Sequence, residues 1–157
     1  MKTLRSYIAW LRVKVAVVAG RRRLGSLFVG LAVIGAFLAF YDAYDEVTEN
    51  FSSCTVSSII SCATVFRSGY TSIFGVPFYA LGLIWFPAMA AIGLILVWRG
   101  GSVGSPFMPP LLMVGNVFTV YLWYLEIFVI RAYCPVCISM YVVNYLMTAL
   151  ALKEVEQ

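Results

Sequence analysis

Four cysteines are the residues of this chain whose type and spacing most clearly indicate chemistry. Cys54 and Cys62 are separated by seven residues, and further along Cys134 and Cys137 enclose a proline in a C-x-x-C motif. Because proline fits the first position of a helix, we expect Cys134 at or near a helix N-cap. The positive end of the helix dipole stabilises a thiolate there, and the thiolate is the reactive form of cysteine. Cys134 is therefore a candidate nucleophile, and Cys137, almost one turn deeper, is placed to meet a hydrophobic electron acceptor.

The same cysteines are compatible with three other roles. They could bind structural zinc, but one C-x-x-C motif combined with a seven-residue spacing departs from the usual ligand pattern. They could form two static disulfides in an oxidising compartment, but a C-x-x-C motif at a helix start is more typical of redox proteins. Free core thiols fit least, because the cysteines cluster in two segments. The pattern favours redox chemistry without a metal.

The chain contains no histidine. Catalytic pairs that need histidine, histidine-ligated haem and histidine metal sites are therefore excluded within this chain. The four cysteines remain as the candidates for redox or metal chemistry.

The composition indicates that lipid surrounds most of the elements that position the cysteines. Hydrophobic residues make up 62% of the chain and charged residues 11%, whereas an ordinary soluble domain carries roughly 25% charged residues. Four apolar stretches have about the length that crosses a bilayer, and they cover residues 24–41, 76–98, 111–130 and 135–152. We predict an all-α membrane protein in which four transmembrane helices form one bundle over residues 24–152.

Positive charges predict the orientation of this bundle in a cell membrane. Seven of the eleven Lys and Arg residues lie in the N-terminal segment 1–23, and Arg99 and Lys153 fall on the same side. Because cytoplasmic flanks carry the excess of Lys and Arg, both termini, including the tail 153–157, are expected in the cytoplasm. The outer loop 42–75 and all four cysteines are then extracytoplasmic. Membrane topology accounts for the net charge of +4 without a nucleic-acid partner.

The basic N-terminal segment has two alternative interpretations. Apolar residues recur at helical spacing over residues 4–18, so this stretch could lie as an amphipathic helix on anionic headgroups. It could equally be a mobile basic tail that only sets the topology. A cleaved signal peptide fits less well, because Arg12 and Lys14 interrupt the apolar run.

The outer loop is expected to bring its cysteines to the bundle. Following an acidic stretch, helical apolar spacing is found at Val56, Ile59, Ile60 and Ala63. A short lid helix there would carry Cys62 toward Cys134 and leave Cys54 accessible. An ordinary apolar loop that packs down on the bundle is the simpler alternative.

These features together resemble the vitamin K epoxide reductase family. The likeness rests on the wide cysteine pair before the second span, Ser68, the Ser-Ile-Phe-Gly-Val-Pro stretch at 72–77, and the C-x-x-C motif followed by Tyr141 and Asn144. It covers residues 24–152. Bacterial disulfide bond formation protein B, another quinone-linked thiol oxidase, instead places its C-x-x-C motif in the first outer loop.

The resemblance implies a membrane thiol oxidoreductase that generates disulfide bonds. Cys54 would exchange with a separate thioredoxin-like (DsbA-like) protein, and Cys62 would attack or pair with Cys134. Cys137 would then pass electrons to a quinone of the ubiquinone, menaquinone or vitamin K type at the outer end of the bundle. We expect a monomer. Alternatives are a vitamin K epoxide reductase and a structural four-helix membrane protein with static disulfides.

The residues expected to bind the quinone are Tyr141, Asn144, Ser68, Thr71, Phe74 and Phe78. The family uses a tyrosine matching Tyr141 beside the quinone. Where the animal enzymes have an asparagine that hydrogen-bonds the ring carbonyl, this chain has Thr71, which weakens the inference of epoxide activity.

Polar residues within the spans have other expected roles. Glu126 is the only ionisable residue inside a predicted span, and it could pass a proton to the quinone. Ion pairing with Arg131 or snorkelling toward the membrane surface is the favoured interpretation. Asn116 and Asn144 are expected to form hydrogen bonds between helices.

Overall fold

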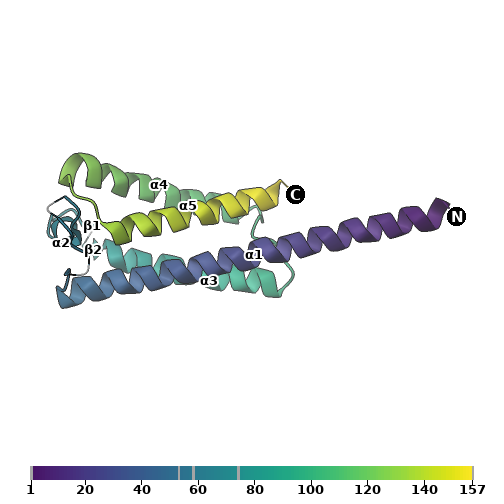
Figure 1. The fold of residues 1–157 in the computed structure, drawn as a ribbon, viewed down its shortest axis with the longest axis horizontal. Helices are drawn as coiled ribbons and strands as arrows, with labels where there is room; N and C mark the ends of the chain where they lie inside the picture. Colours follow the sequence, from purple (N-terminus) through teal and green to yellow (C-terminus); the bar gives the residue numbers. More distant parts are fainter. Residues whose placement is uncertain (1, 53, 58, 74, 157) are drawn as a thin grey trace.

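The computed structural model describes residues 2–52, 54–57, 59–73 and 75–156, with their side chains from Gly20 onward. Its elements are α1 (Lys2–Thr48), α2 (Cys62–Phe66), β1 (Ser72–Ile73), β2 (Val76–Pro77), α3 (Phe78–Trp98), α4 (Met108–Tyr124), the π-helical segment η1 (Leu125–Ile130) and α5 (Pro135–Val155). The long helices run side by side, with α2, β1 and β2 gathered at one end and the C-terminus at the other (Figure 1). We call the end that carries α2 the cysteine end.

Four helices are long and apolar enough to cross a membrane within the part of the chain that the structure describes. They are Gly20–Thr48, Phe78–Trp98, Met108–Ile130 and Pro135–Val155. The prediction of an all-α, four-helix membrane protein is confirmed.

The first of these helices is longer than the sequence predicted. Residues 42–48, assigned above to the outer loop, continue α1 as regular helix. The acidic residues were taken to end the span, but Asp42 and Asp45 lie on the buried side of α1. Helix α1 ends where Glu49 adopts a left-handed conformation with a φ of 53°.

The backbone of residues 2–19 is also helical, and it continues α1 beyond the bundle (Figure 1). A helical backbone over residues 4–18 is what the first of the two interpretations expects. Contact of this segment with lipid headgroups stays a prediction.

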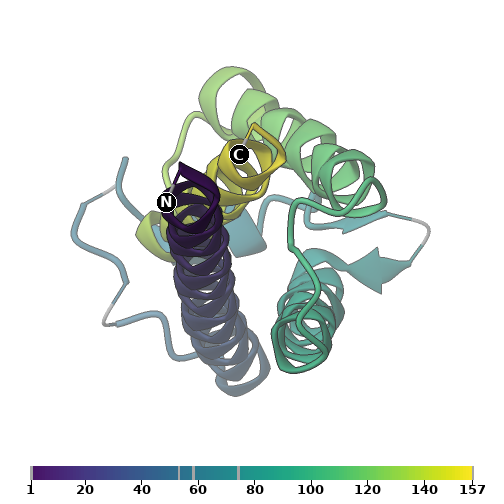
Figure 2. The ribbon, with the colours of Figure 1, turned by 90° about the vertical axis from the view of Figure 1, so that its right-hand side faces the viewer.

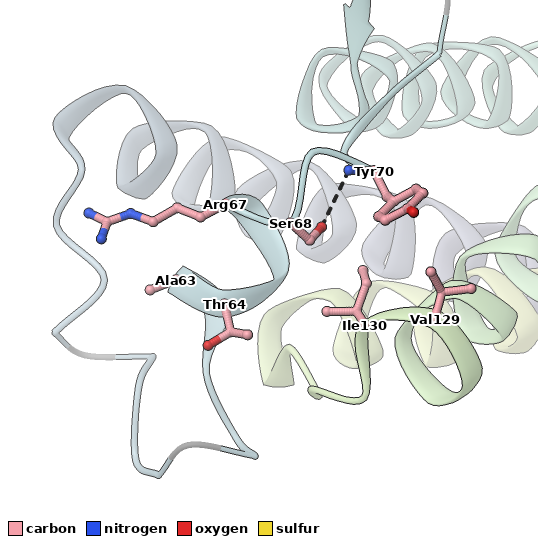
Figure 3. A pocket seen from close by; sticks show the side chains of 7 residues that line it. All are labelled: Ala63, Thr64, Arg67, Ser68, Tyr70, Val129 and Ile130. Atoms are coloured by element: carbon pink, nitrogen blue, oxygen red, sulfur yellow. Dashed lines mark hydrogen bonds between the residues drawn. The ribbon is translucent and has the colours of Figure 1, made fainter.

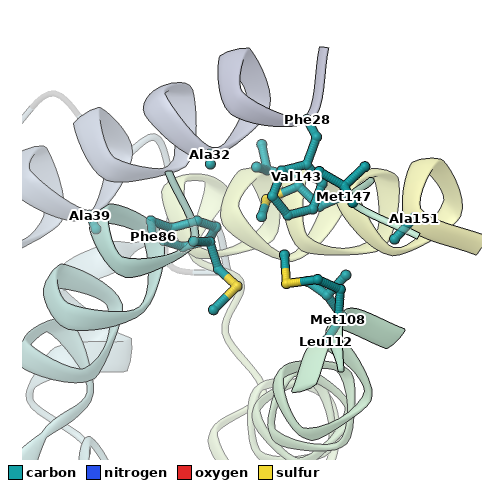
Figure 4. Close-up of a cluster of buried hydrophobic side chains, with 11 residues drawn as sticks. Phe28, Ala32, Ala39, Phe86, Met108, Leu112, Val143, Met147 and Ala151 are labelled. Carbon is teal, nitrogen blue, oxygen red and sulfur yellow. The ribbon is translucent and has the colours of Figure 1, made fainter. Parts of the chain in front are cut away.

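Apolar side chains join the helices along the length of the bundle. Helix α1 packs against α3 and α5, and α4 packs against α5, which lies between α1 and α4 when the bundle is viewed from its end (Figure 2). Buried members of this core include Phe28, Ala32, Phe86, Leu112 and Met147 (Figure 4). A Cβ atom on Gly35 would overlap the ring of Phe86, so the close approach of α1 and α3 requires glycine at this position.

A chain of hydrogen bonds ties α3, α4 and α5 together inside the bundle. Trp85 Nε1 donates to Asn144 Oδ1 at 3.1 Å, and Asn144 Nδ2 donates to Asn116 Oδ1 at 2.7 Å. Asn116 Nδ2 in turn donates to Thr148 Oγ1 at 3.0 Å. We call these four residues the polar clasp. The predicted hydrogen bonding of Asn116 and Asn144 between helices is confirmed.

The third span changes its helical geometry near the cysteine end. Helix α4 passes into η1, and Arg131, with a φ of 57°, ends the segment in a left-handed conformation. Leu125 and Glu126 are both buried at the start of η1. π-Helical turns occur frequently at functional sites, and nothing in the apolar pattern of the span indicated this one.

The lid helix is shorter than predicted and lies later in the chain. Val56, Ile59 and Ile60 are outside any helix and exposed, and only Ala63 of the predicted apolar set falls in α2. Ser61 starts α2 instead, because its hydroxyl accepts a hydrogen bond from the Thr64 backbone N–H at 3.2 Å.

Candidate active site

A short backbone bridge holds the outer loop against the start of α5. The Ser61 N–H donates to the Tyr133 carbonyl at 3.1 Å, and the Tyr133 N–H donates to the Ile59 carbonyl at 2.8 Å. Residues Ile60 and Tyr133 therefore pair as in a parallel sheet. The bridge places Cys62, the next residue after Ser61, beside Cys134.

All four cysteines meet at this point as two adjacent disulfides. Cys54 is bonded to Cys62, and Cys134 is bonded to Cys137. The Sγ atoms of Cys62 and Cys134 are 3.3 Å apart. Within the bonded pairs these sulfurs are not available as metal ligands. The arrangement allows thiol–disulfide exchange to cross from one pair to the other once either disulfide is opened.

Cys134 occupies the N-cap of α5, as the sequence predicted. It has extended backbone angles, Pro135 follows at the first helical position, and Cys134 Sγ accepts a hydrogen bond from the Cys137 backbone N–H at 3.2 Å. When the disulfide opens, the same N–H and the positive end of the helix stabilise a Cys134 thiolate.

The expected accessibility of Cys54 is wrong for this state of the protein. Cys54 is only 5% exposed, because it belongs to an apolar cluster with Phe51, Val65 and Phe66 at the cysteine end. The rings of Phe51 and Phe66 stack with centroids 5.4 Å apart. A protein partner can reach Cys54 only after this cover moves.

An apolar cavity of about 570 Å³ lies next to the inner cysteine pair. Its lining comes from all the long helices, from η1, and from α2 with the segment that follows it. Cys137 is on its wall, whereas Cys54, Cys62 and Cys134 are not. Most of the wall is hydrocarbon, and polar side chains reach it at Asp42, Thr71, Thr119, Glu126, Tyr141 and Asn144.

The structure separates the residues expected to bind the quinone into three groups. Tyr141, Asn144, Thr71 and Phe78 line the cavity. Ser68 is not part of this lining and lies in a neighbouring pocket between α2, the segment that follows it and the end of η1 (Figure 3). Its hydroxyl donates to the Val65 carbonyl at 2.6 Å. Phe74 is outside the described residues.

Two of the cavity residues already have partners within the protein. The Thr71 hydroxyl donates to the Phe66 carbonyl at 3.2 Å, and the Asn144 side chain belongs to the polar clasp. The Thr71 hydroxyl has used its only hydrogen and keeps both lone pairs, whereas Asn144 keeps a second lone pair on Oδ1 and a second amide hydrogen for a ligand.

The favoured interpretation of Glu126 is wrong. This side chain neither snorkels nor pairs with Arg131: it is 4% exposed, and no ion pair joins the two residues in the described part of the chain. Its carboxylate instead accepts a hydrogen bond from the Tyr141 hydroxyl at 2.7 Å. The π-helical geometry of η1 explains the difference, since it carries Glu126 into the interior, whereas Arg131 lies beyond its end and is exposed.

Sequence reasoning missed Asp42 as a member of the site. A carboxylate oxygen of Asp42 lies within 4.8 Å of both Cys134 Sγ and Cys137 Sγ. A signal was present, because Asp42 follows Phe28, Ala32 and Ala39 along the buried stripe of α1 at helical spacing. Continuing this period past the last apolar residue places Asp42 inside the bundle.

The comparison with known families agrees with this geometry. The sequence model of the vitamin K epoxide reductase family matches residues 26–152, which include both cysteine pairs, the cavity lining and most of each of the four membrane helices. No curated protein matches the chain. With a match over most of its length, the chain belongs to the vitamin K epoxide reductase family of membrane oxidoreductases.

Proposed function

We propose that this protein oxidises the dithiol of a separate thioredoxin-like protein and passes the electrons through its two cysteine pairs to a membrane quinone. One observation carries the proposal: Cys62 Sγ lies 3.3 Å from Cys134 Sγ, while Cys137 lies on the wall of the apolar cavity. The cysteines thus form a continuous route from the loop to the interior of the bundle.

The relay consists of two exchange steps. In the first, one thiolate of the partner attacks Cys54, and the second partner thiolate resolves the mixed disulfide. This step oxidises the partner and leaves Cys54 and Cys62 reduced. In the second step Cys62 attacks Cys134, and Cys54 then resolves the Cys62–Cys134 bond. The outer disulfide is restored, and two electrons now reside in the thiols of Cys134 and Cys137.

The cavity fits a quinone by its chemistry. Its hydrocarbon walls suit an isoprenoid-bearing ring. The second amide hydrogen of Asn144 can be donated to a ring oxygen, and the hydroxyls of Tyr141 and Thr71 can do the same when they rotate away from their present acceptors. Tyr141, Asn144 and Thr71 would hold the ring, with Phe78 packed against it. A bound quinone would accept two electrons and two protons from the Cys134–Cys137 dithiol.

Membrane orientation belongs to the same proposal. With the basic flanks in the cytoplasm, the cysteine end faces the extracytoplasmic side, where disulfides persist. Single cysteines introduced into a cysteine-free variant test this. A membrane-impermeant thiol reagent should label exposed Val56→Cys in intact cells and should label exposed Phe107→Cys only after lysis. The reverse pattern would contradict the orientation.

Quinone reduction by the purified, lipid-embedded protein tests the function. With a reduced thioredoxin-like protein as donor, we expect stoichiometric quinol formation, which Cys137→Ala abolishes. Unchanged turnover in Cys137→Ala would contradict the relay.

Two further outcomes would favour the alternative functions. Turnover of vitamin K epoxide at a rate comparable to the quinone would indicate the epoxide reductase. If both disulfides resist the reduced partner and excess quinol, the structural role with static disulfides is correct.

A further inference from the structure

Two buried carboxyl groups line the cavity beside the inner cysteine pair. Asp42 comes from the end of α1 and Glu126 from η1, and each is 4% exposed. Both line the cavity together with Cys137 and Tyr141. Neither group forms an ion pair with a Lys or Arg among the described residues, so their burial has no structural charge partner to explain it.

The proposed reaction needs proton-transfer groups at this place. Oxidation of a dithiol breaks two S–H bonds and forms one S–S bond, which releases two protons with the two electrons. Reduction of a quinone to a quinol places two protons on the ring oxygens. The chain has no histidine, the residue most often used for such transfers, and the cysteine pair is buried away from water.

Asp42 lies near the cysteine sulfurs, where protons are released, and Glu126 and Tyr141 lie at the cavity, where protons are needed. The Asp42 carboxylate is within 4.8 Å of the sulfurs of Cys134 and Cys137. A thiol proton can cross this distance after a small shift of the side chains or through one water molecule. The Glu126 carboxylate accepts a hydrogen bond from the Tyr141 hydroxyl at 2.7 Å, and Tyr141 lies on α5 about one turn after Cys137. This pair links the cysteine end of α5 to the cavity.

We propose that Asp42 takes the protons released by the Cys134–Cys137 dithiol and that the Glu126–Tyr141 pair delivers protons to the ring oxygens of the bound quinone. The inference rests on the proposed function. Asp42 takes one proton at a time and passes it to Glu126 across the cavity that both residues line, and the Glu126–Tyr141 pair passes it on to a ring oxygen. After two such transfers two protons have left the thiols, two have reached the ring, and both carboxyl groups are back in their starting state.

The chain offers a matched control for Asp42. Asp45 is the same residue type on the same helix and is equally buried, at 4% exposed. It does not line the cavity, and its carboxylate does not lie within 4.8 Å of the sulfurs of both Cys134 and Cys137. Comparing Asp42→Asn with Asp45→Asn therefore separates a role near the sulfurs from the general effect of neutralising a buried aspartate in α1.

The experiment measures two half-reactions of the full-length protein in lipid. Asp42→Asn and Glu126→Gln should each lower kcat for quinone reduction by about 100-fold or more, the usual range for loss of an acid–base group. The KM for the quinone and the opening of the Cys54–Cys62 disulfide by a dithiol without quinone should stay within about twofold of wild type. Asp42→Glu should recover part of the lost kcat, and Asp45→Asn should keep most of it.

Three results would overturn the inference. The first is an equal kcat for Asp42→Asn and Asp45→Asn. The second is an Asp42→Asn variant in which quinone reduction and opening of the Cys54–Cys62 disulfide slow equally. The third is an Asp42→Glu variant that is as slow as Asp42→Asn. Failure of the proposed function looks different, because then the wild-type protein itself reduces no quinone or Cys137→Ala leaves the rate unchanged.

Discussion

The two cysteine pairs differ in what holds them. The Cys54–Cys62 pair sits on a loop and a five-residue helix, secured by the Ser61 cap and by two backbone hydrogen bonds to and from Tyr133. The Cys134–Cys137 pair begins α5, a 21-residue helix packed between α1 and α4. One pair can therefore be displaced to meet a protein without disturbing the bundle, whereas the other is fixed beside a cavity.

This difference suggests a division of labour. A redox site that exchanges with a bulky protein needs a cover that opens, and the Phe51–Phe66 stack covers Cys54 with few backbone bonds to break. A site that reduces a small apolar molecule needs a rigid, dry wall, which α5 and its neighbours provide.

The largest effect should come from cutting the connection between the two pairs. In Cys62→Ser, oxidation of the partner should fall to background, because the outer disulfide that accepts the partner's electrons cannot form and the sulfur placed to attack Cys134 is missing. After chemical reduction of this variant, quinone should still restore the Cys134–Cys137 disulfide at about the wild-type rate. Thiol alkylation followed by mass spectrometry measures this recovery. If Cys62→Ser also loses quinone-dependent reoxidation, the two pairs do not act as separate units.

The apolar core should dominate the stability of the bundle that fixes the inner pair. Phe28→Ala should lower the free energy of unfolding by about 3–5 kcal/mol, since it leaves a cavity among α1, α3 and α5. Phe37→Ala is the control, because Phe37 lies on the same helix but is 70% exposed on its outer face. Reversible denaturation in mixed micelles should show a loss below about 1 kcal/mol for the control. Equal losses would contradict the packing described for α1.

A smaller effect on the bundle is expected from the polar clasp. Asn144→Ala removes partners from Trp85 and Asn116 and should cost about 1–2 kcal/mol. The same denaturation experiment measures it. If Asn144 serves the ligand alone, stability should be unchanged while the KM for the quinone rises.

The smallest expected effect concerns the outer pair. Ser61→Ala removes the cap of α2 and should cost about 1 kcal/mol locally. Because Cys62 is the next residue, transfer from the outer to the inner pair should slow by a few-fold, while quinone reduction by the chemically reduced inner pair stays unchanged. Stopped-flow measurement of each step distinguishes them. Slowing of the quinone step alone would contradict the assignment of α2 to the outer pair.

The sequence predicted the parts of the fold that depend on local chemistry. Apolar length identified four membrane helices, and Pro135 placed Cys134 at the N-cap of α5. The family resemblance, drawn from the cysteine spacings and the residues around them, agrees with the family match over residues 26–152.

Features that depend on packing were harder to predict. The buried positions of Asp42 and Glu126 contradict the usual expectation that charges end a span or reach the surface. The π-helical geometry of η1 has no periodic signal in an apolar stretch where every residue is compatible with lipid. The position of α2 depends on the Tyr133 bridge, a contact between segments more than 70 residues apart.

The contact between Cys62 and Cys134 is the central claim, and a double variant tests it directly. In Cys54→Ser/Cys137→Ser each remaining thiol has lost its own disulfide partner, while the 3.3 Å approach of the two sulfurs is retained. Under mild oxidation we predict near-complete formation of a Cys62–Cys134 disulfide, detected as one linked peptide pair by mass spectrometry. Two thiols that stay free in the folded protein under these conditions would contradict the relay.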